Sequence, residues 1–310
     1  MLSSQVILET PAGYWFLKKN IFSYNKTQIF QSNKILYPNA GLIQLALGTK
    51  LSNGVFAPTS WFFSNLNLIK NIGISYIVKI NNDTKKEYDV YKKIKEYERY
   101  NYSMEKSKFL EVLDQCSISP NCTVLIFDEI KSNLTNFYKE YQSKNLLDKI
   151  FIELIQAFKL LHELGLTHGD VKPDNILIDN NLNTFLIDFD ITIPFIINGK
   201  FKINRKYKSY GTPLFAAIPA LTGISNAPIN DIESLLYTLC YLLKLPPFDI
   251  INSKDTKEVI LDHKEDFSDK ILNDKIEHPF KKVFQYCYSF PYETSYNLCY
   301  DTITELYKTN

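Results

Sequence analysis

Residues 168–190 read HGDVKPDNILIDNNLNTFLIDFD, and this stretch decides the fold. Two short apolar runs within it, 176–178 and 185–187, flank a turn of sequence Asn-Asn-Leu-Asn and predict a β-hairpin. Upstream, apolar residues at steps of three and four predict a long amphipathic helix that stops near Gly165: Leu147, Ile150, Phe151, Leu154, Phe158 and Leu161. The sequence therefore sets a group of polar residues between a helix and a hairpin.

Four polar residues before the hairpin resemble the catalytic loop of protein kinases. They match the pattern H-x-D-x-K-x-x-N: His168, Asp170, Lys172 and Asn175. Gly169 stands where that pattern usually has arginine. After the hairpin, Asp188 opens the tripeptide Asp-Phe-Asp, which resembles the metal-binding D-F-G with aspartate in place of glycine. These two motifs on either side of one hairpin together resemble a protein kinase domain.

The chemistry of phosphoryl transfer gives each of these residues a role. The reaction needs an oriented hydroxyl and cations spread around the developing phosphoryl charge. We expect Asp170 to orient the substrate hydroxyl or accept its proton, and Lys172 to neutralise the γ-phosphate of ATP. Asn175 and Asp188 are expected to supply oxygen ligands to Mg²⁺. His168 is expected to pack and to hydrogen-bond the loop backbone rather than to titrate.

The rest of the chain divides into a strand-rich part and a helical part. β-Forming residues predict strands over 6–8, 14–17, 47–51, 75–80, 109–115 and 123–130. One lysine- and glutamate-rich helix is predicted over 85–100, and helical periodicity dominates after residue 130. The pattern and the kinase resemblance together predict an α+β, bilobal protein kinase-like fold. We expect an N-lobe over residues 1–130, with 1–45 as an N-terminal extension, and a C-lobe over 131–310, together forming one kinase domain.

Several N-lobe residues resemble the parts of a protein kinase that hold ATP. The stretch Tyr-Ile-Val-Lys-Ile at 76–80 is similar to the V-A-I-K strand and implies that Lys79 contacts the α- and β-phosphates. We expect Glu87 to be the carboxylate partner of Lys79, with Glu96 as the alternative. The glycine-rich loop of kinases is matched weakly, because only one glycine remains at its three positions: Ser52, Gly54 and Ala57.

A later segment narrows the resemblance to one group of kinases. It reads Gly-Thr, then Phe-Ala and Gly, and finally Asp-Ile-Glu-Ser-Leu, and this order is similar to casein kinase 1 and the vaccinia-related kinases. The likeness implies that Thr212 helps to position the substrate hydroxyl and that Asp231 anchors the catalytic loop from a buried helix. It also implies a gatekeeper at Phe127 and a hinge, containing Asp128 and Ile130, that offers backbone groups to adenine.

A long loop over 189–229 leads into a helix that we expect to be buried. Asn230 and Glu233 have the spacing of a capping box, which predicts Asn230 as the N-cap. The helix body, 232–245, is apolar nearly all round, and such helices lie inside a protein.

The same loop lacks the arginine contacts that order it in many protein kinases. Gly169 has no side chain to pair with a phosphorylated loop residue, and no arginine follows Arg205. The glutamate of the usual A-P-E motif is absent as well. We therefore expect packing and neutral hydrogen bonds to order the loop, in a kinase that is active without loop phosphorylation.

Composition excludes several classes of protein. The chain has 310 residues and a net charge of +1, so no overall field draws it to nucleic acid or to an acidic membrane. Its five cysteines lack the spacing of a zinc site or a disulfide framework, and no signal peptide or membrane span is recognisable. Abundant Asn, Ile, Lys and Tyr fit an AT-rich genome, as in some viruses. We expect a soluble, cytoplasmic monomer, in the host cytoplasm if viral, that acts on protein substrates.

Two other functions are compatible with the motifs. A pseudokinase that serves as a binding scaffold would explain the eroded glycine-rich loop and Asp190. Aminoglycoside and choline kinases, which phosphorylate small molecules, share His-Gly-Asp and the five-residue step to asparagine. Lys172 argues against the second alternative, because those enzymes rarely have lysine there. A serine/threonine protein kinase remains the preferred interpretation.

Overall fold

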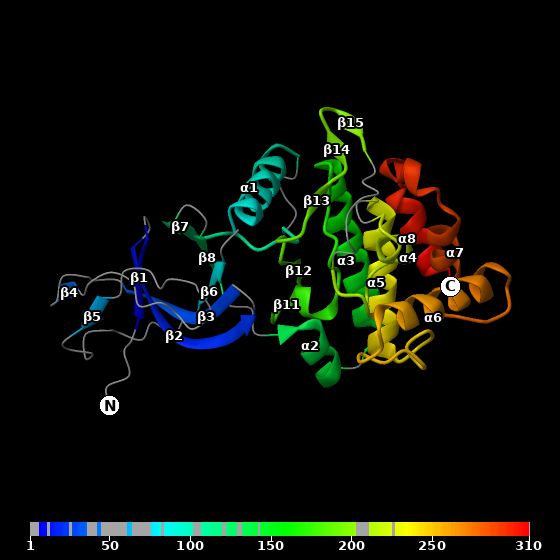
Figure 1. The fold of residues 1–310 in the computed structure, drawn as a ribbon, viewed down its shortest axis with the longest axis horizontal. Helices are drawn as coiled ribbons and strands as arrows, with labels where there is room; N and C mark the ends of the chain where they lie inside the picture. The colour runs from blue at the N-terminus through cyan, green and yellow to red at the C-terminus, as the bar shows by residue number, and fades with distance from the viewer. Residues whose placement is uncertain are drawn as a thin grey trace. The chain divides into compact units, whose positions relative to one another are not determined.

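The computed structural model divides the chain into two compact units (Figure 1). One contains Met1–Arg99 and Leu110–Glu129, and the other contains Tyr100–Phe109 and Ile130–Asn310. The structure describes residues 6–10, 13–24, 27–35, 42–44, 61–63, 76–81, 84–101, 107–119, 122–128, 132–141, 143–202, 211–224 and 227–309.

The first unit is built on an antiparallel sheet of six strands in the order β1-β2-β3-β6-β8-β7. The strands are β1 (Val6–Thr10), β2 (Gly13–Tyr24), β3 (Thr27–Ile35), β6 (Tyr76–Asn81), β7 (Asp114–Ser119) and β8 (Cys122–Asp128). A separate hairpin pairs β4 (Leu42–Gln44) with β5 (Trp61–Phe63), and helix α1 (Thr84–Asn101) follows β6. The helix predicted over 85–100 is confirmed by α1.

The strand predictions for this unit are mostly confirmed. Strands are present near 6–8, 14–17, 75–80 and 123–130, while the one expected over 47–51 lies outside the described residues. The strand predicted over 109–115 is wrong in its start, because β7 begins at Asp114. Phe109 belongs to the second unit, where its backbone forms a parallel bridge with Leu186.

The second unit is mainly helical. Its helices are α2 (Leu134–Tyr141), α3 (Lys144–Glu163), α4 (Ile218–Leu221), α5 (Pro228–Leu243), α6 (Lys257–Leu272), α7 (Lys281–Ser289) and α8 (Tyr300–Lys308), with 3-10 turns η2 (Pro173–Asn175) and η3 (Tyr292–Asn297). Three of its strands form an antiparallel sheet in the order β12 (Thr184–Leu186), β11 (Ile176–Ile178) and β9 (Ser132–Asn133). Two antiparallel pairs join β10 (Leu166–Thr167) to β13 (Ile193–Pro194) and β14 (Ile196–Ile197) to β15 (Lys200–Phe201). Among the residues described here, none of the helices combines the length and the apolar character that a membrane span requires.

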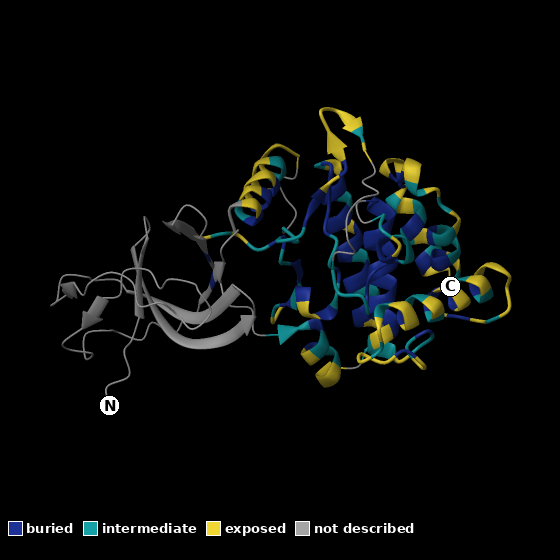
Figure 2. Cartoon of the chain, in the orientation of Figure 1, coloured by how far each residue is buried: buried dark blue, intermediate teal, exposed yellow. Residues whose placement is uncertain are grey.

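Helices α3 and α5 form the centre of this unit (Figure 2). Every residue of α5 from Pro228 to Cys240 is buried, which confirms the predicted buried helix. α3 ends as its sequence predicts, because Gly165 follows it with a φ of 73°, a left-handed conformation that glycine adopts without strain. The catalytic-loop candidates, residues 168–175, follow β10 directly, and in chain order they come after α3 and before α5.

The capping box predicted at the start of α5 is wrong. The helix begins at Pro228 with Ala227 as its N-cap, so Asn230 lies inside the first turn. Proline is favoured at this first helical position because its fixed φ suits the helix and its missing N–H has no partner there in any case. Glu233 therefore does not cap its own helix. Its carboxylate accepts a hydrogen bond from Ile218 N instead, at 2.8 Å.

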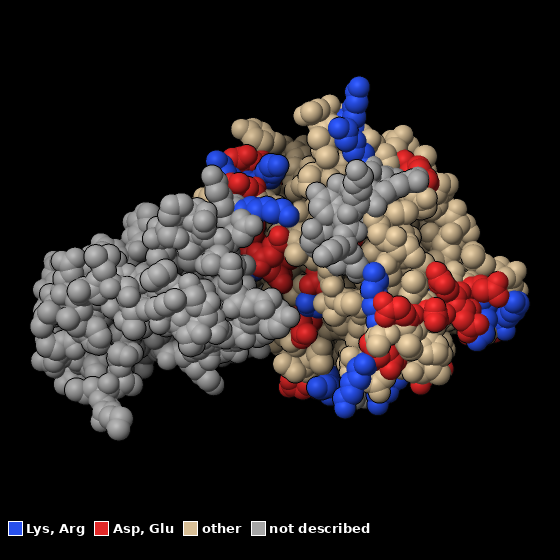
Figure 3. Space-filling model, in the orientation of Figure 1, with Lys and Arg blue, Asp and Glu red and all other residues tan. Residues whose placement is uncertain are grey.

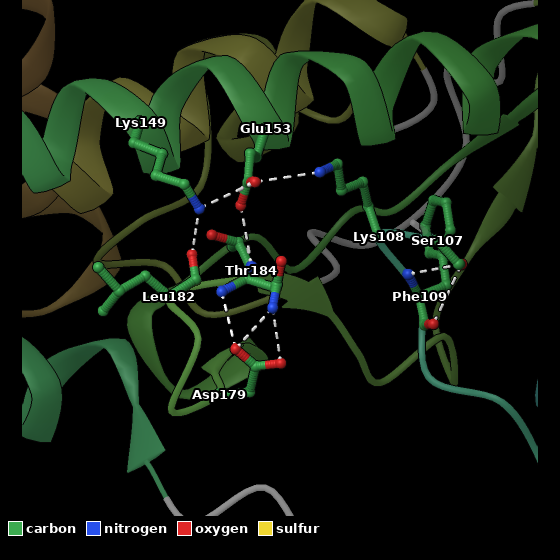
Figure 4. Close-up of polar contacts among 9 residues, drawn as sticks. Ser107, Lys108, Phe109, Lys149, Glu153, Asp179, Leu182 and Thr184 are labelled. Atoms are coloured by element: carbon green, nitrogen blue, oxygen red, sulfur yellow. Dashed lines mark hydrogen bonds and ion pairs between the residues drawn. The ribbon is translucent and has the colours of Figure 1, made fainter. Parts of the chain in front are cut away.

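The predicted hairpin is present as β11 and β12, and one buried glutamate fixes it to α3 (Figure 4). Glu153 Oε2 accepts a hydrogen bond from Thr184 N at 2.9 Å, and Oε1 lies 3.1 Å from both Lys108 Nζ and Lys149 Nζ. The turn itself is closed by Asp179, whose carboxylate accepts from the backbone N–H groups of Asn181 and Asn183. These contacts fix the hairpin that separates the two polar motifs.

Replacing Glu153 with Gln is expected to destabilise the second unit by about 2 kcal/mol, because it removes two ion pairs and a charge-assisted hydrogen bond. Burial raises the pKa of Glu153, but hydrogen bonds from Thr184, Lys108 and Lys149 outweigh it and hold the pKa below 4.5. A lowered folded-state pKa stabilises the fold above the unfolded pKa, and this contribution is lost as the pH falls.

Thermal unfolding at pH 7 and in acid measures this effect. The stability difference between wild type and Glu153→Gln should be largest at neutral pH and should shrink below about pH 4.5, the ordinary pKa of glutamate. Glu140→Gln on α2 is the matched control, because that side chain is exposed. Equal unfolding temperatures for the two variants would contradict the anchoring role.

Candidate active site

The loop 168–175 is held from α5 by a single carboxylate. Asp231 Oδ2 accepts a hydrogen bond from His168 N at 2.8 Å, and Oδ1 accepts one from Gly169 N at 2.9 Å. The predicted anchoring of this loop by Asp231 is therefore confirmed. Two consecutive N–H groups can bind the two oxygens of one carboxylate only if the backbone turns sharply, and Gly169 supplies that turn with a φ of 81°.

His168 packs inside the loop, as predicted. Its Nε2 lies 2.9 Å from Ile187 O, and its Nδ1 accepts from Asp170 N at 3.2 Å. These partners fit a neutral ring with its proton on Nε2, since a carbonyl needs a donor and an N–H needs an acceptor. The ring also packs edge-on against Phe189, with centroids 5.3 Å apart. His168 thus links the loop to the residues on either side of Asp188.

Asp170 is the centre of a compact polar cluster. Its Oδ2 lies 2.6 Å from Lys172 Nζ and 3.3 Å from Asn175 Nδ2, while Oδ1 accepts from Thr212 N at 2.8 Å. Lys172 Nζ also donates to Thr212 Oγ1 at 3.0 Å. Both carboxylate oxygens are therefore fixed in direction, and a cation lies directly beside them. The structure brings together the three side chains predicted to be catalytic, Asp170, Lys172 and Thr212.

A glycine allows the segment carrying Thr212 to approach the loop. A Cβ at Gly211 would lie 2.5 Å from Gly169 O, closer than real Cβ atoms come to a backbone oxygen, and the φ of Gly211 is 87°. Any side chain at residue 211 would push the two backbones apart. In the Gly-Thr pair seen in the sequence, the glycine thus lets the backbone lie close to Gly169, and the threonine side chain then forms a hydrogen bond with Lys172.

Asn175 and Asp188 form the candidate metal site, and their residue types fit Mg²⁺. Ile187 N donates to Asn175 O at 3.0 Å, so Asp188 begins directly beside Asn175. Both hydrogen bonds from the Asn175 side chain use Nδ2, which leaves an amide oxygen as the atom it can offer to a cation. Asp188 has a φ of 71°, a left-handed conformation that aspartate tolerates better than most residues. Carboxylate and amide oxygens are suitable ligands for a hard divalent cation.

Two further residues support the loop, and sequence reasoning missed both. His162 Nε2 lies 2.9 Å from Asp231 Oδ2, and His162 Nδ1 lies 2.5 Å from Tyr300 Oη on α8. Burial raises the pKa of Asp231, but the hydrogen bond and charge of His162 outweigh it and the pKa stays below its usual value. Burial likewise raises the pKa of Tyr300, which therefore keeps its hydroxyl proton. Nothing in the local sequence distinguishes His162 from its apolar neighbours on α3.

The first unit contains a buried ion pair at the predicted ATP-binding lysine. Lys79 Nζ on β6 lies 2.8 Å from Glu87 Oε2 on α1, and both side chains are largely buried. Glu96, the alternative partner, is exposed and lies 3.9 Å from Lys92 Nζ. Phe127, the predicted gatekeeper, is buried against Tyr91 with ring centroids 5.3 Å apart. These contacts arrange the lysine and the gatekeeper on neighbouring strands, since β6 pairs with β8.

Of the remaining residues predicted to bind the nucleotide, Asp128 lies in the part of the chain that the structure describes. Asp128 is the last residue of β8, and its backbone pairs with Tyr76. Ile130 and the weak glycine-rich loop lie outside the described residues: Ser52, Gly54 and Ala57. Their contacts with ATP stay predictions from sequence.

Comparisons with known proteins agree with this geometry. A protein kinase domain family model matches residues 66–299. A probable serine/threonine-protein kinase of fowlpox virus is 30% identical over 126 residues, which cover 39% of this chain and 43% of that protein. A putative serine/threonine-protein kinase of Acanthamoeba polyphaga mimivirus is 35% identical over 121 residues, covering 37% of this chain and 41% of its own. A probable casein kinase I homologue of Encephalitozoon cuniculi is 32% identical over 95 residues, 30% of each chain.

These matches confirm the predicted family and fold class. The viral relatives and the casein kinase I homologue also agree with the resemblance seen in the later Gly-Thr segment. The chain spans less than half of the length of each of these relatives.

Proposed function

Since the chain belongs to the protein kinase domain family, we propose that it transfers the γ-phosphate of ATP, with Mg²⁺, to serine or threonine hydroxyls of proteins. The observation that carries this proposal is the Asp170 cluster. A carboxylate held on both oxygens, beside a lysine and a threonine, is arranged to orient a hydroxyl and to balance phosphoryl charge.

Asp170 acts on the acceptor. Its carboxylate hydrogen-bonds the incoming hydroxyl, fixes the direction of the oxygen lone pair and takes the proton as the new bond forms. Thr212 N and Lys172 Nζ hold the carboxylate so that it does not rotate between turnovers. Lys172 also places a positive charge where negative charge develops on the transferred group.

The nucleotide is held by residues from both sequence motifs. Asn175 and Asp188 would bind Mg²⁺, which would neutralise charge on the phosphates. Lys79, kept in place by Glu87, would contact the α- and β-phosphates. Ser52, Gly54 and Ala57 stay phosphate contacts predicted from the sequence resemblance alone. The hinge at Asp128 and Ile130 would hydrogen-bond adenine beside Phe127.

Transfer from radiolabelled ATP tests the proposal. Casein and the protein itself serve as protein acceptors, with aminoglycosides and choline as small-molecule acceptors. We expect label on serine or threonine of the protein acceptors and none on the small molecules. Lys172 favours this outcome, because the aminoglycoside and choline kinases rarely have lysine at that position. Label on a small molecule alone would overturn the proposal, as would ATP binding without transfer to any acceptor.

The activity is expected to be independent of loop phosphorylation. Gly169 offers no partner for a phosphate, and the side chain of Thr192 is buried, which makes it a poor target for modification. The other candidate sites, Ser209 and Tyr210, lie outside the described residues. Phosphatase treatment, with mass spectrometry to confirm an unmodified loop, should leave initial rates within about twofold. A fall of about tenfold, or about 1.4 kcal/mol in the barrier, would show that phosphorylation activates the enzyme.

A further inference from the structure

Helix α6 carries a lysine on its buried face. The inward positions Ile260, Phe267 and Ile271 are apolar and buried, and Lys264 lies among them with 0% of its surface exposed. The opposite face is acidic and exposed, and acidic side chains gather over α6 in Figure 3: Glu258, Asp262, Glu265, Asp266 and Asp269. Lysine is almost never fully buried unless its ammonium group has partners, because desolvation of a charge is costly.

The partners of Lys264 are backbone carbonyls and an aromatic ring. Its Nζ donates to Ala216 O at 2.6 Å and to Pro213 O at 3.4 Å. It also lies 3.9 Å from the centroid of the Tyr237 ring, a position in which a cation is attracted by the face of the ring. The lysine thus ties the inner face of α6 to the segment 211–218.

Glu233 holds the same segment from α5. Only 2% of this residue is exposed, and its Oε1 accepts from Ile218 N at 2.8 Å. A positive side chain therefore binds the carbonyl groups of the segment, and a negative side chain binds an N–H group two residues after Ala216. Each charge is matched to the polarity of the backbone group that it contacts.

A continuous set of hydrogen bonds links these contacts to Asp170. Thr212 O accepts from the N–H groups of Phe215 and Ala216, at 3.0 and 3.1 Å, which fold residues 212–216 into a tight turn. Thr212 N donates to Asp170, and Thr212 Oγ1 accepts from Lys172. A displacement of Ala216 would therefore move Thr212 relative to Asp170.

We propose that Lys264 and Glu233 are positioning residues that fix segment 211–218 and so hold Thr212 beside the acceptor hydroxyl. The proposal rests on the function proposed above for Asp170, Lys172 and Thr212. It adds two buried ionisable side chains to the packing and neutral hydrogen bonds that are expected to order this region. It predicts that changes at Lys264 or Glu233 alter the kinetics of the protein acceptor and leave the affinity for ATP unchanged.

Lys264 and Glu233 both titrate near pH 7, whereas the other described hydroxyl, thiol and imidazole groups that surround them are neutral at that pH. Burial lowers the pKa of Lys264 to about 7 and raises that of Glu233 to about 7. Burial also raises the pKa of the hydroxyl and thiol groups around them: Tyr237, Cys240, Cys287 and Tyr288. Burial lowers the pKa of His278, which contacts Cys240, to about 4.

By linkage, these pKa shifts make the stabilising contribution of the pair vary with pH. Between pH 4.5 and about 7 the folded state keeps a proton on Glu233 that the unfolded chain has lost, so stability falls as the pH rises. Between about 7 and 10.5 the unfolded chain keeps a proton on Lys264 that the folded state has lost, so stability rises. The contribution is smallest near pH 7. A role in positioning accounts for such a pair better than a role in stability.

Steady-state kinetics of Lys264→Met, Glu233→Gln and the double variant test the proposal, with Lys270→Met as the matched control. Lys270 is on the same helix and pairs with Asp266 at the surface. We expect Lys264→Met to lower kcat/KM for a protein acceptor about tenfold, with the KM for ATP within about twofold of wild type. The double variant should unfold at a temperature at least as high as either single variant, because no unpaired buried charge remains, and should still transfer slowly.

A pH profile separates positioning from a purely structural role. Glu233→Gln removes the negative charge that favours the protonated form of Lys264, so the alkaline limb of kcat/KM should move to lower pH. An unmoved limb would contradict the proposal, as would a double variant with the transfer rate of wild type. This arm needs only Glu233→Gln, which keeps an oxygen to accept from Ile218 N, so it holds even if Lys264→Met fails to fold.

Hydrogen exchange gives a readout that does not depend on activity. The amides of Thr212, Ala216 and Ile218 should exchange faster in Lys264→Met than in Lys270→Met. Faster exchange in a protein whose wild type shows no transfer would support the anchor and overturn the proposed function. Unchanged exchange and kinetics in Lys264→Met, with an active wild type, would overturn the anchor and leave the function intact.

Discussion

Replacing Asp170 with Asn should lower kcat by about 10²–10⁴-fold, the usual contribution of a positioned acid or base. Asparagine keeps an oxygen that can accept from Thr212 N, so the loop should retain its shape. The side chain can no longer take a proton, and Lys172 loses the carboxylate that lies 2.6 Å from its Nζ. Asp170 has no role in holding the phosphates, so the affinity for ATP with Mg²⁺ should stay within about twofold.

Single-turnover transfer to a protein acceptor and equilibrium ATP binding measure the two parts of this prediction. Asp174→Asn is the matched control, because Asp174 lies in the same loop but is exposed and accepts a hydrogen bond from the Asn133 side chain at 2.9 Å. It should transfer at close to the wild-type rate. If Asp170→Asn were as active as Asp174→Asn, the assignment of Asp170 as the group that orients the hydroxyl would be wrong.

Replacing Asp188 with Asn should abolish Mg²⁺-dependent ATP binding and lower transfer by about a thousandfold, or about 4 kcal/mol. The substitution removes one negative charge from the candidate metal site. Asn tolerates the left-handed φ of 71° at this position, whereas Ala would add backbone strain and confuse the result. The effect therefore differs in kind from that of Asp170→Asn, since binding and chemistry are lost together.

Titration of ATP affinity against Mg²⁺ distinguishes the two roles. Wild type should bind ATP more tightly as Mg²⁺ rises, and removal of Mg²⁺ with EDTA should reproduce the behaviour of Asp188→Asn. Retention of the full Mg²⁺ dependence by that variant would exclude Asp188 as a ligand. Asn175→Ala offers a second check, because its amide oxygen is the other candidate ligand.

The parts of the fold that sequence predicted are those set by local pattern. The β11–β12 hairpin follows from two apolar runs around an asparagine-rich turn, and α3 from a regular apolar stripe that ends at Gly165. The start of α5 was predicted incorrectly because two signals competed. The Asn230–Glu233 spacing suggested a capping box, but the helix begins at Pro228. Glu233 instead accepts a hydrogen bond from Ile218 N, fifteen residues earlier in the chain.

The site could be predicted only as far as its motifs extend along the chain. Asp170, Lys172 and Thr212 came from motif positions, and the structure brings them together. His162, Tyr300 and Lys264 carry no such signal, because none of them belongs to a motif and the partners of each are distant in sequence. Their importance depends on which element packs against them, and that is a property of the tertiary fold.

The contact between His162 and Tyr300 sets a limit on how this protein can be shortened. Asp231, which holds the loop at His168 and Gly169, is itself in contact with His162, and His162 contacts the first residue of α8. The family similarity ends at residue 299, one position before Tyr300. A protein shortened at its C-terminal end to residue 299 would thus keep every catalytic motif and lose the contact of Tyr300 with His162. For expression, crystallisation or inhibitor screening, α8 belongs to the minimal catalytic unit.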